Sequence, residues 1–232
     1  MRHLLACTAA TLTLLASACT PRAVVPTAEQ ERVQKELSGQ QRYLRVAANV
    51  GPLWGDTRKL LVADQPAAEI DLVLSPGGDV IAPPRFDRVL RPGTPVRIES
   101  VEFPAGWLIA ERVVTTPRYH PWVYVRLPGE TRPGVLVLSQ TVETFDDVRG
   151  ELERMLTADD PSAAFNSLAP EYRNAILRKE AIEGMSPAAL EMAWGVPERK
   201  RIDRPSHTEE WSWPGGKRRA FLRDDRVERL EK

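Results

Sequence analysis

Proline and glycine divide the middle of this chain into short apolar segments, and this division limits the fold more than any other feature. The 232-residue sequence holds 20 prolines and 14 glycines. Proline fixes φ and lacks a backbone N–H, so it disfavours long helices and central strands. Turn-forming sequences built on proline and glycine recur between residues 43 and 140. The sequence therefore predicts many short strands joined by turns in this region.

The apolar segments between these turns predict seven strands. They span residues 43–47, 60–62, 70–74, 96–103, 107–114, 123–127 and 135–138. Many short strands with regular turns are typical of a small all-β barrel or sandwich, which we expect over residues 42–140. Residues 90–98, with the sequence LRPGTPVRI, resemble bacterial SH3-like modules. This resemblance also implies a small barrel.

The first 18 residues have the order of a secretory signal. Arg2 and His3 precede an apolar stretch at 4–15, and three small residues follow at 16–18. The stretch is too short to span a bilayer stably. Because Cys19 comes directly after the small residues, the segment is similar to a bacterial lipoprotein signal, in which Cys19 becomes the acylated first residue. The alternatives are an ordinary signal cleaved nearby and an uncleaved anchor.

The residues after Cys19 predict a tether and an address. Thr20, which is not acidic, resembles the pattern that directs lipoproteins to the outer membrane of diderm bacteria, here facing the periplasm. Residues 20–27 are small, apolar and interrupted by proline, as in a tether. Val33 and Leu37 have helical spacing within the charged segment 28–41. We therefore expect residues 19–41 to form a tether followed by a short helix.

Composition excludes several kinds of chemistry. Cys7 lies within the signal, so acylation of Cys19 leaves the mature chain without a free thiol. Disulfides, cysteine–zinc sites and a cysteine nucleophile are then excluded. The formal net charge is +0, so no overall field attracts nucleic acid. With no zinc-ligand spacing and no phosphate-binding loop, we expect neither metal nor cofactor.

A helical connector is predicted over residues 144–175. Thr144 or Asp146 can cap a helix that runs to about residue 157. Asp159, Asp160 and Pro161 form a second start signal, because proline suits the first helical turn. Two pairs of adjacent acidic residues, Asp146 with Asp147 and Asp159 with Asp160, lie at these helix starts. Helix capping explains them better than paired-carboxylate catalysis does.

The last segment, residues 176–232, predicts a small α+β domain. Ser186 can cap a helix that begins with Pro187 and ends at Gly195. Strands are expected at 209–213, 218–223 and 226–230, with tight turns at 214–216 and 224–225. The whole chain is therefore expected to be α+β: an all-β domain, a helical connector and a helix-plus-sheet domain.

This C-terminal pattern resembles the BamE/SmpA family of small outer-membrane lipoproteins. The residues that carry the resemblance are Gly184, Met185, Ser186, Leu190, Gly195, Pro197, Trp211, Trp213, Phe221 and Val227. The resemblance implies two helices packed on a small antiparallel sheet and a non-catalytic scaffolding role in the envelope. The chain departs from the family by placing the β-rich segment 42–140 before the pattern.

Aromatic and basic residues of this domain are candidate partner contacts. Tryptophan is common at partly wet interfaces, which makes Trp194 and Trp213 candidates. The basic candidates are Arg199, Lys200, Arg201 and Arg218, accompanied by Arg204, Lys217 and Arg219. They predict a basic face toward lipid phosphates. Because Glu209, Glu210, Asp224 and Asp225 are close in sequence, an ordinary salt-bridged face is the favoured alternative.

Catalysis is not indicated. Beyond the signal the histidines are His120 and His207, and neither accompanies a nucleophile motif. Tyr119, His120 and Trp122 share one loop, and as loop contacts they would line a groove. A structural or solvated role for this histidine is the simpler interpretation, so we expect a protein that is not an enzyme.

These features predict a lipid-anchored, non-catalytic scaffold or docking protein of the bacterial envelope that takes part in outer-membrane assembly or maintenance. The envelope protein it contacts is not specified by the sequence. The main alternative is a module that binds peptidoglycan through the SH3-like segment and the aromatic loop. Inhibition of a periplasmic enzyme and hydrolysis that uses His120 are the less favoured alternatives.

Overall fold

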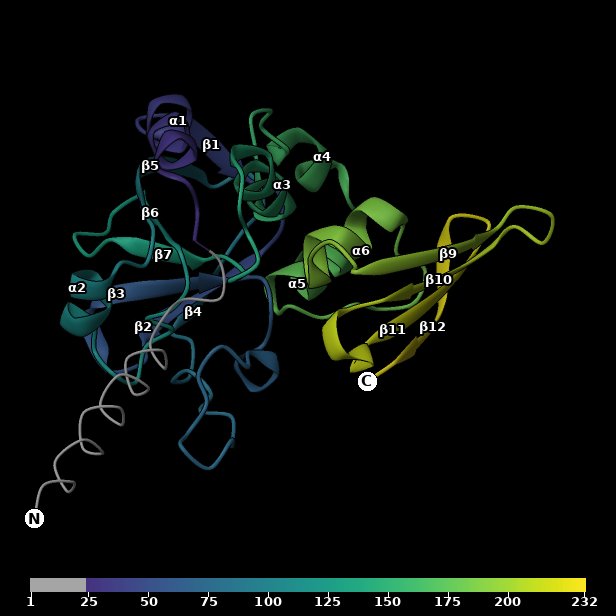
Figure 1. Cartoon of the computed structure of the whole chain (residues 1–232). Coiled ribbons are helices and arrows are strands. Elements are labelled where there is room, and N and C mark those ends of the chain that lie inside the picture. Colours follow the sequence, from purple (N-terminus) through teal and green to yellow (C-terminus); the bar gives the residue numbers. More distant parts are fainter. Residues whose placement is uncertain (1–23) are drawn as a thin grey trace, which may run out of the picture.

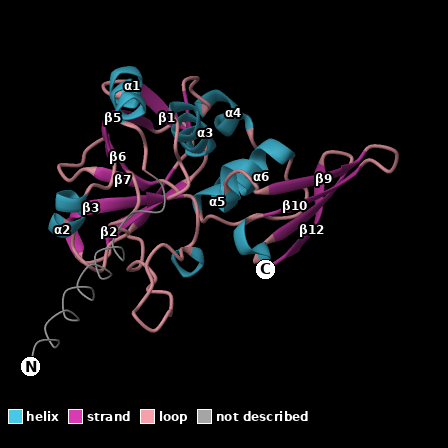
Figure 2. Ribbon diagram, in the orientation of Figure 1, coloured by secondary structure: helices cyan, strands magenta, loops and turns pink. Residues whose placement is uncertain are grey.

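The structure is a computed structural model that describes residues 24–232, and it contains two sheets with separate cores (Figures 1 and 2). The described residues form twelve strands, six α-helices and two short 3-10 helices. We call residues 24–157 the N-terminal module and residues 158–232 the C-terminal module. The expected α+β class is confirmed.

The N-terminal module contains a mixed eight-stranded sheet of order β4-β2-β3-β7-β6-β5-β1-β8. Its strands are β1 (Gln41–Leu44), β2 (Ala48–Leu53), β3 (Asp56–Ala63), β4 (Arg88–Leu90), β5 (Pro95–Glu102), β6 (Trp122–Arg126), β7 (Gly134–Val137) and β8 (Leu156–Thr157). Neighbours are antiparallel except β3 and β7, which are parallel.

This sheet must curve strongly, because four residues connect β4 to β5. In a flat sheet the two strands would lie five spacings apart, about 24 Å at about 4.8 Å each. Residues 91–94 allow five Cα steps, which reach only about 17 Å. The chain therefore pulls β4, at one edge, toward β5, near the other edge. This curvature encloses an apolar interior.

One face of the sheet packs on α1 (Thr27–Leu37) and α3 (Phe145–Met155). Val33 and Leu37 of α1 are buried there, as their spacing predicted. Thr144 caps α3, since its hydroxyl accepts from the Asp147 N–H while the Asp147 carboxylate accepts from the Thr144 N–H. Because α3 contributes to this core, it belongs to the N-terminal module and is not only a connector.

The opposite face is covered by two long connections. Residues 64–87 include η1 (Ala67–Glu69), and residues 104–121 include α2 (Gly106–Glu111). The strands predicted at 70–74 and 107–114 are therefore wrong. The first segment makes one isolated bridge, between Leu74 and Val80, and the second forms α2. A short apolar segment does not distinguish strand from helix by its period alone.

The C-terminal module packs helices on a four-stranded antiparallel sheet of order β12-β11-β10-β9. Its elements are α4 (Ser162–Ser167), α5 (Pro170–Leu177), α6 (Pro187–Trp194), β9 (Arg199–Asp203), β10 (Thr208–Ser212), η2 (Pro214–Gly216), β11 (Arg219–Arg223) and β12 (Arg226–Glu231). The sequence predicted α6 and three of these strands but not β9. Leu190, Trp211 and Leu222 are among the buried residues between helices and sheet.

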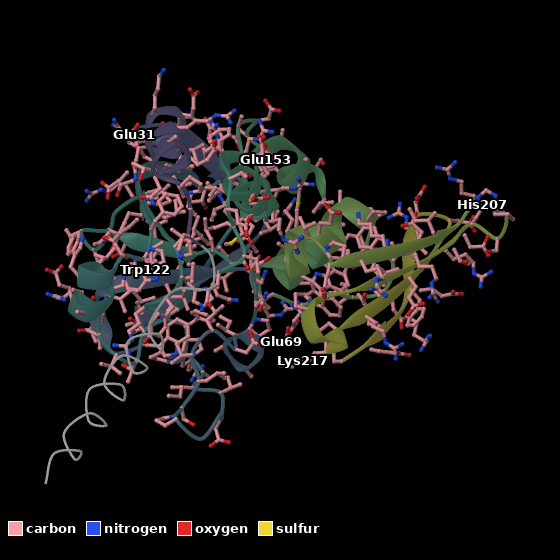
Figure 3. The ribbon with its side chains drawn as sticks, in the orientation of Figure 1. Glu31, Glu69, Trp122, Glu153, His207 and Lys217 are labelled. Carbon is pink, nitrogen blue, oxygen red and sulfur yellow. The ribbon has the colours of Figure 1, made fainter. Side chains whose placement is uncertain are left out.

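The predicted boundaries of α6 are confirmed in detail. The Ser186 hydroxyl accepts from the Ala189 N–H, and Pro187 is the first helical residue. Gly195 ends the helix with φ of 86° and ψ of 175°, a conformation open almost only to glycine. The β9–β10 hairpin then extends away from the N-terminal module, with His207 at its tip (Figures 1 and 3).

Replacing Gly195 with alanine should destabilise the protein by about 2–4 kcal/mol, from backbone strain and steric overlap. A Cβ at Gly195 would overlap the carboxylate of Asp64 in the N-terminal module. Urea denaturation of Gly195→Ala measures the loss. In an Asp64→Ala background the same substitution should cost less, because the overlap is then absent and the backbone strain alone remains. An unchanged midpoint for Gly195→Ala in the wild-type background would contradict the geometry.

Candidate functional site

The two modules meet along an interface that includes hydrogen bonds to buried backbone. The Ala47 N–H donates to the Met192 carbonyl at 2.8 Å, and the Lys179 ammonium donates to the Ala47 carbonyl at 2.7 Å. Arg154 of α3 donates to the Val196 carbonyl at 2.8 Å. Ala47 is fully buried and lies in the core of the C-terminal module. The modules are therefore packed together rather than loosely linked.

A charge pair lies at the centre of this interface. The Arg218 Nε of the C-terminal module is 2.9 Å from the Glu69 Oε2 of the N-terminal module. Arg218 is only 4% exposed. Its guanidinium carbon lies 5.2 Å from the centroid of Trp194 and 5.8 Å from that of Trp213. The buried cation is thus stabilised by one carboxylate and by two aromatic rings.

Lys179 adds a second cation, which is partly buried. It follows α5, with φ of 58°, which is unusual for a residue other than glycine. Burial lowers its pKa from 10.5 to about 8; the nearby Asp64 carboxylate opposes the shift, and Arg218 adds to it. Desolvation favours the neutral amine, whereas Asp64 favours the ammonium. Asp64 and Glu69 on one module therefore face Lys179 and Arg218 on the other.

A cleft opens beside this charge cluster, between the modules. Its larger part has a volume of about 590 Å³, and residues such as Asp64, Val137, Glu151, Met155, Glu198 and Trp213 line it. A second hollow of about 200 Å³ adjoins it and reaches Glu69, Asp71 and Lys217. Figure 3 shows Glu69 and Lys217 close together where the modules meet. We call the two hollows together the intermodule cleft.

Glu151 of α3 is a partly buried carboxylate of the cleft. It accepts a hydrogen bond from the Ser139 N–H at 2.8 Å. Burial raises its pKa, although this hydrogen bond and the charge of Arg154 partly oppose the increase. The group is therefore a poorly solvated carboxylate beside an apolar wall.

Trp194 and Trp213, expected as partner contacts, are core residues instead. Each is 1% exposed, and their rings pack edge to face with centroids 5.0 Å apart. The Trp213 indole N–H donates to the Gly195 carbonyl at 3.0 Å. Arg218 is also buried, as described above. Arg218 contacts the other module, the two tryptophans belong to the C-terminal core, and all three offer almost no surface to another molecule.

The other basic candidates lie on β9 and are exposed. All five residues of β9 are exposed, Arg199, Lys200 and Arg201 among them. Lys200 pairs with Glu191 of α6 at 2.7 Å, and its ammonium lies 3.7 Å from the centroid of Trp211. Arg201 lies 3.7 Å from Glu210. Arg199 has no carboxylate partner among the described residues.

The outer face of the C-terminal sheet carries alternating charges. Glu210 lies 3.7 Å from Arg201 and 3.7 Å from Arg219, and Arg219 also pairs with Glu231 at 2.6 Å. The ion pairs thus cross all four strands. This arrangement matches the salt-bridged alternative for that face and leaves the β9 edge as its most basic part.

The aromatic loop does not form an open groove. Trp122 is 1% exposed, and the Arg112 guanidinium carbon lies 3.8 Å from its ring centroid. Arg112 also donates to the His120 carbonyl at 2.7 Å and pairs with Glu102. The His120 Nδ1 lies 2.8 Å from the Leu138 carbonyl oxygen. Tyr119 is half-buried, with Arg118 over its ring.

His120 is buried, and its ring contacts the backbone. Burial lowers its pKa, with the Leu138 carbonyl opposing and Arg112 reinforcing the shift. Among residues 24–232 no three His, Cys, Asp or Glu side chains gather closely enough to hold a metal ion. Within the same residues no helix has the length and apolarity needed to cross a membrane. Cys19 lies outside the described residues.

Comparison of the chain with protein-family models, curated proteins and solved structures found no match. The function must therefore be argued from the chain itself. Sequence reasoning missed Asp64, Glu69, Glu151 and Lys179, because their roles arise from packing between distant segments. Gly195, which lies against Asp64, was the one residue near them that the sequence pattern had marked.

Lys179 makes the free energy of unfolding vary with pH in the alkaline range. Between pH 8 and 10.5 the unfolded chain binds more protons at this residue than the folded one, so its contribution to stability rises with pH. We expect Lys179→Met to remove this rise. Urea denaturation at about pH 7.5 and about pH 9.5 measures it.

The matched control is Lys217→Met, which changes an exposed lysine of the same module. It should keep the wild-type pH profile. Equal pH dependence in the wild type and Lys179→Met would show that this lysine is not desolvated in the folded protein.

Proposed function

We propose that the protein is a lipid-anchored envelope protein that acts as a non-catalytic docking module. In this proposal acylated Cys19 holds it at the periplasmic side of the outer membrane. Its C-terminal sheet binds another envelope protein, in outer-membrane assembly or maintenance. The observation that carries the proposal is the open edge of β9.

β9 is the longest unpaired sheet edge in the described part of the chain. On the opposite edge of the same sheet, the Val227 N–H and carbonyl bond to Met185 and Gly184. The edges of the larger sheet, β4 and β8, have three and two residues. Within residues 24–232, β9 has no backbone partner beyond β10. Such an edge can accept an added strand from another chain.

The charge of this edge indicates which strand it accepts. Arg199, Lys200 and Arg201 are consecutive, and Ile202 beside them is 55% exposed. Basic residues on an edge discourage pairing with a second copy of the same edge, because like charges would face each other. An extended segment with acidic side chains meets no such repulsion. The partner chemistry is therefore an acidic strand with an apolar residue opposite Ile202.

The resemblances to the BamE/SmpA family and to SH3-like modules support this proposal. The family pattern implies two helices on a small antiparallel sheet, and α5, α6 and β9–β12 have that arrangement. Gly184 and Gly195, two residues of the pattern, have positive φ. The curved larger sheet agrees with the small barrel that the SH3-like segment implies. We propose both resemblances as the basis for an envelope scaffold.

The position of Cys19 agrees with a short tether. It precedes Val24, the first described residue, by five residues. At about 3.5 Å per residue, five residues reach at most about 18 Å, so Val24 would stay within that distance of the lipid. Anchoring would then confine docking on β9 to one membrane surface, where confinement raises the effective concentration of partners held at the same membrane.

The alternative functions lose support from the positions of their residues. Peptidoglycan binding and hydrolysis both depended on an open loop around His120. Burial of Trp122 and His120 closes that loop. No comparable observation favours inhibition of a periplasmic enzyme.

The anchor is tested by mass spectrometry of the membrane fraction. We expect the mature N-terminal peptide to begin at Cys19 with attached acyl chains. Cys19→Ser should move the protein to the soluble fraction, because removing several chains at about 0.8 kcal/mol per buried CH₂ abolishes membrane retention. An unmodified cysteine in membrane-bound protein would contradict the anchor.

The docking edge is tested by crosslinking and pull-down from detergent-solubilised envelopes. The double variant Arg199→Glu and Arg201→Glu should reduce recovery of the partner at least about tenfold through charge repulsion. The double variant Arg85→Glu and Arg91→Glu, which makes the same charge change at two exposed loop positions of the N-terminal module, is the control. Equal recovery with both variants would refute docking on β9. Trp213→Ala is unsuitable because it removes a core residue.

A further inference from the structure

The intermodule cleft is continuous and large enough to bind a ligand. Its two hollows, of about 590 and 200 Å³, share Asp64, Gln65, Val137, Met155 and Pro214. Small-molecule sites commonly have volumes of about 300–1,000 Å³ and often lie between domains. β9 and its exposed residues are not part of either hollow. Any role of the cleft is therefore separate from docking on the sheet edge.

The walls of the larger hollow combine an apolar surface with three carboxylates. Leu138, Leu152, Met155 and Val196 supply apolar side chains from both modules. Asp64, Glu151 and Glu198 supply the carboxylates. This combination suits a ligand with an apolar body and a polar end.

Positive charge within the cleft leaves these carboxylates incompletely balanced. Arg154 is the one basic residue of the larger hollow, and its guanidinium donates to the Val196 carbonyl. Lys217 is the one basic residue of the smaller hollow, where Glu69 is already paired with Arg218. Asp64 is offset by the nearby Lys179, whereas Glu151, Glu198 and Asp71 form no salt bridge within 4 Å among the described residues. Net negative charge therefore remains.

Glu151 is the cleft carboxylate that combines partial burial with the absence of a salt bridge and a single hydrogen bond. Its carboxylate is poorly solvated and has one hydrogen bond, from the Ser139 N–H. A charged donor that reaches a desolvated carboxylate forms a hydrogen bond about twice as strong as a neutral one. A guanidinium can also contact two carboxylates at once, because its donors form a planar fork.

We infer that the intermodule cleft binds a short peptide segment that places an apolar side chain in the larger hollow and an arginine side chain against Glu151. The size of the cleft fits two side chains rather than one. The carboxylates select a cationic side chain, and the apolar wall selects its neighbour. The site draws on both modules, so it exists only when they are packed together.

The test uses a capped Leu-Arg dipeptide amide and the matching Leu-citrulline dipeptide amide. Citrulline keeps the shape of arginine but carries no charge. With the folded wild-type chain from residue 19, titration calorimetry and NMR chemical shifts should show saturable binding of the arginine peptide. Binding of the citrulline peptide should be at least about tenfold weaker. Absence of saturable binding of the arginine peptide would overturn the inference.

Variants locate the site. Glu151→Gln should weaken binding of the arginine peptide at least about tenfold, and Glu198→Gln, at an exposed position, should weaken it without a risk to folding. Glu153→Gln is the matched control on the same helix, because this glutamate points outward (Figure 3) with a side chain 66% exposed. Equal affinity for both peptides, or the same affinity in Glu151→Gln, Glu198→Gln and Glu153→Gln, would also overturn the inference.

Failure of peptide binding in the cleft can be distinguished from failure of docking on β9. The double variant Arg199→Glu and Arg201→Glu should bind the arginine peptide as the wild type does, because β9 lies outside the cleft. Loss of peptide binding in that variant would place the peptide on the sheet edge instead and would overturn assignment to the cleft.

Discussion

The buried charge cluster between the modules is the interaction on which the arrangement of the protein depends. Arg218 is a buried cation and Lys179 a partly buried one, and Glu69 and Asp64 from the other module compensate them. Removing one partner of a buried pair commonly costs about 3–5 kcal/mol, because the remaining charge is left without compensation. Such a cluster has a stringent geometry, so it fixes the relative orientation of the modules. The intermodule cleft and the direction of β9 both follow from that orientation.

Local signals in the sequence predicted much of the fold. Ser186, Pro187 and Gly195 marked the ends of α6, and Thr144 marked the start of α3, because capping depends on neighbouring residues. Strand predictions were wrong where the period of the apolar residues did not distinguish strand from helix, as in the segment that forms α2. β9 escaped prediction because its side chains are all exposed and carry no alternating pattern. Its strand state comes from pairing with β10, which sequence period does not encode.

The candidate sites were less predictable than the fold. Tryptophan and arginine serve both interfaces and cores, and residue type alone did not distinguish these uses for Trp194, Trp213 and Arg218. All three are buried because helices and sheet pack over the two tryptophans and Arg218 lies against the other module. Glu151 and Asp64 lie 87 positions apart in the numbering, yet they line one cleft. No local spacing rule relates two such residues, so only the packed structure brings them together.

Ala47, between β1 and β2, has a consequence for the order in which the molecule is completed. Its N–H and carbonyl are buried and are satisfied by Met192 and by Lys179, the latter 132 positions later. A buried polar group without a partner is costly, so the start of the larger sheet stays incomplete while the C-terminal helices are absent. The connection between β1 and β2 is therefore among the last parts of the N-terminal module to complete its hydrogen bonds. During synthesis, the backbone groups of Ala47 can find their partners only after the C-terminal third of the chain has been made and has folded.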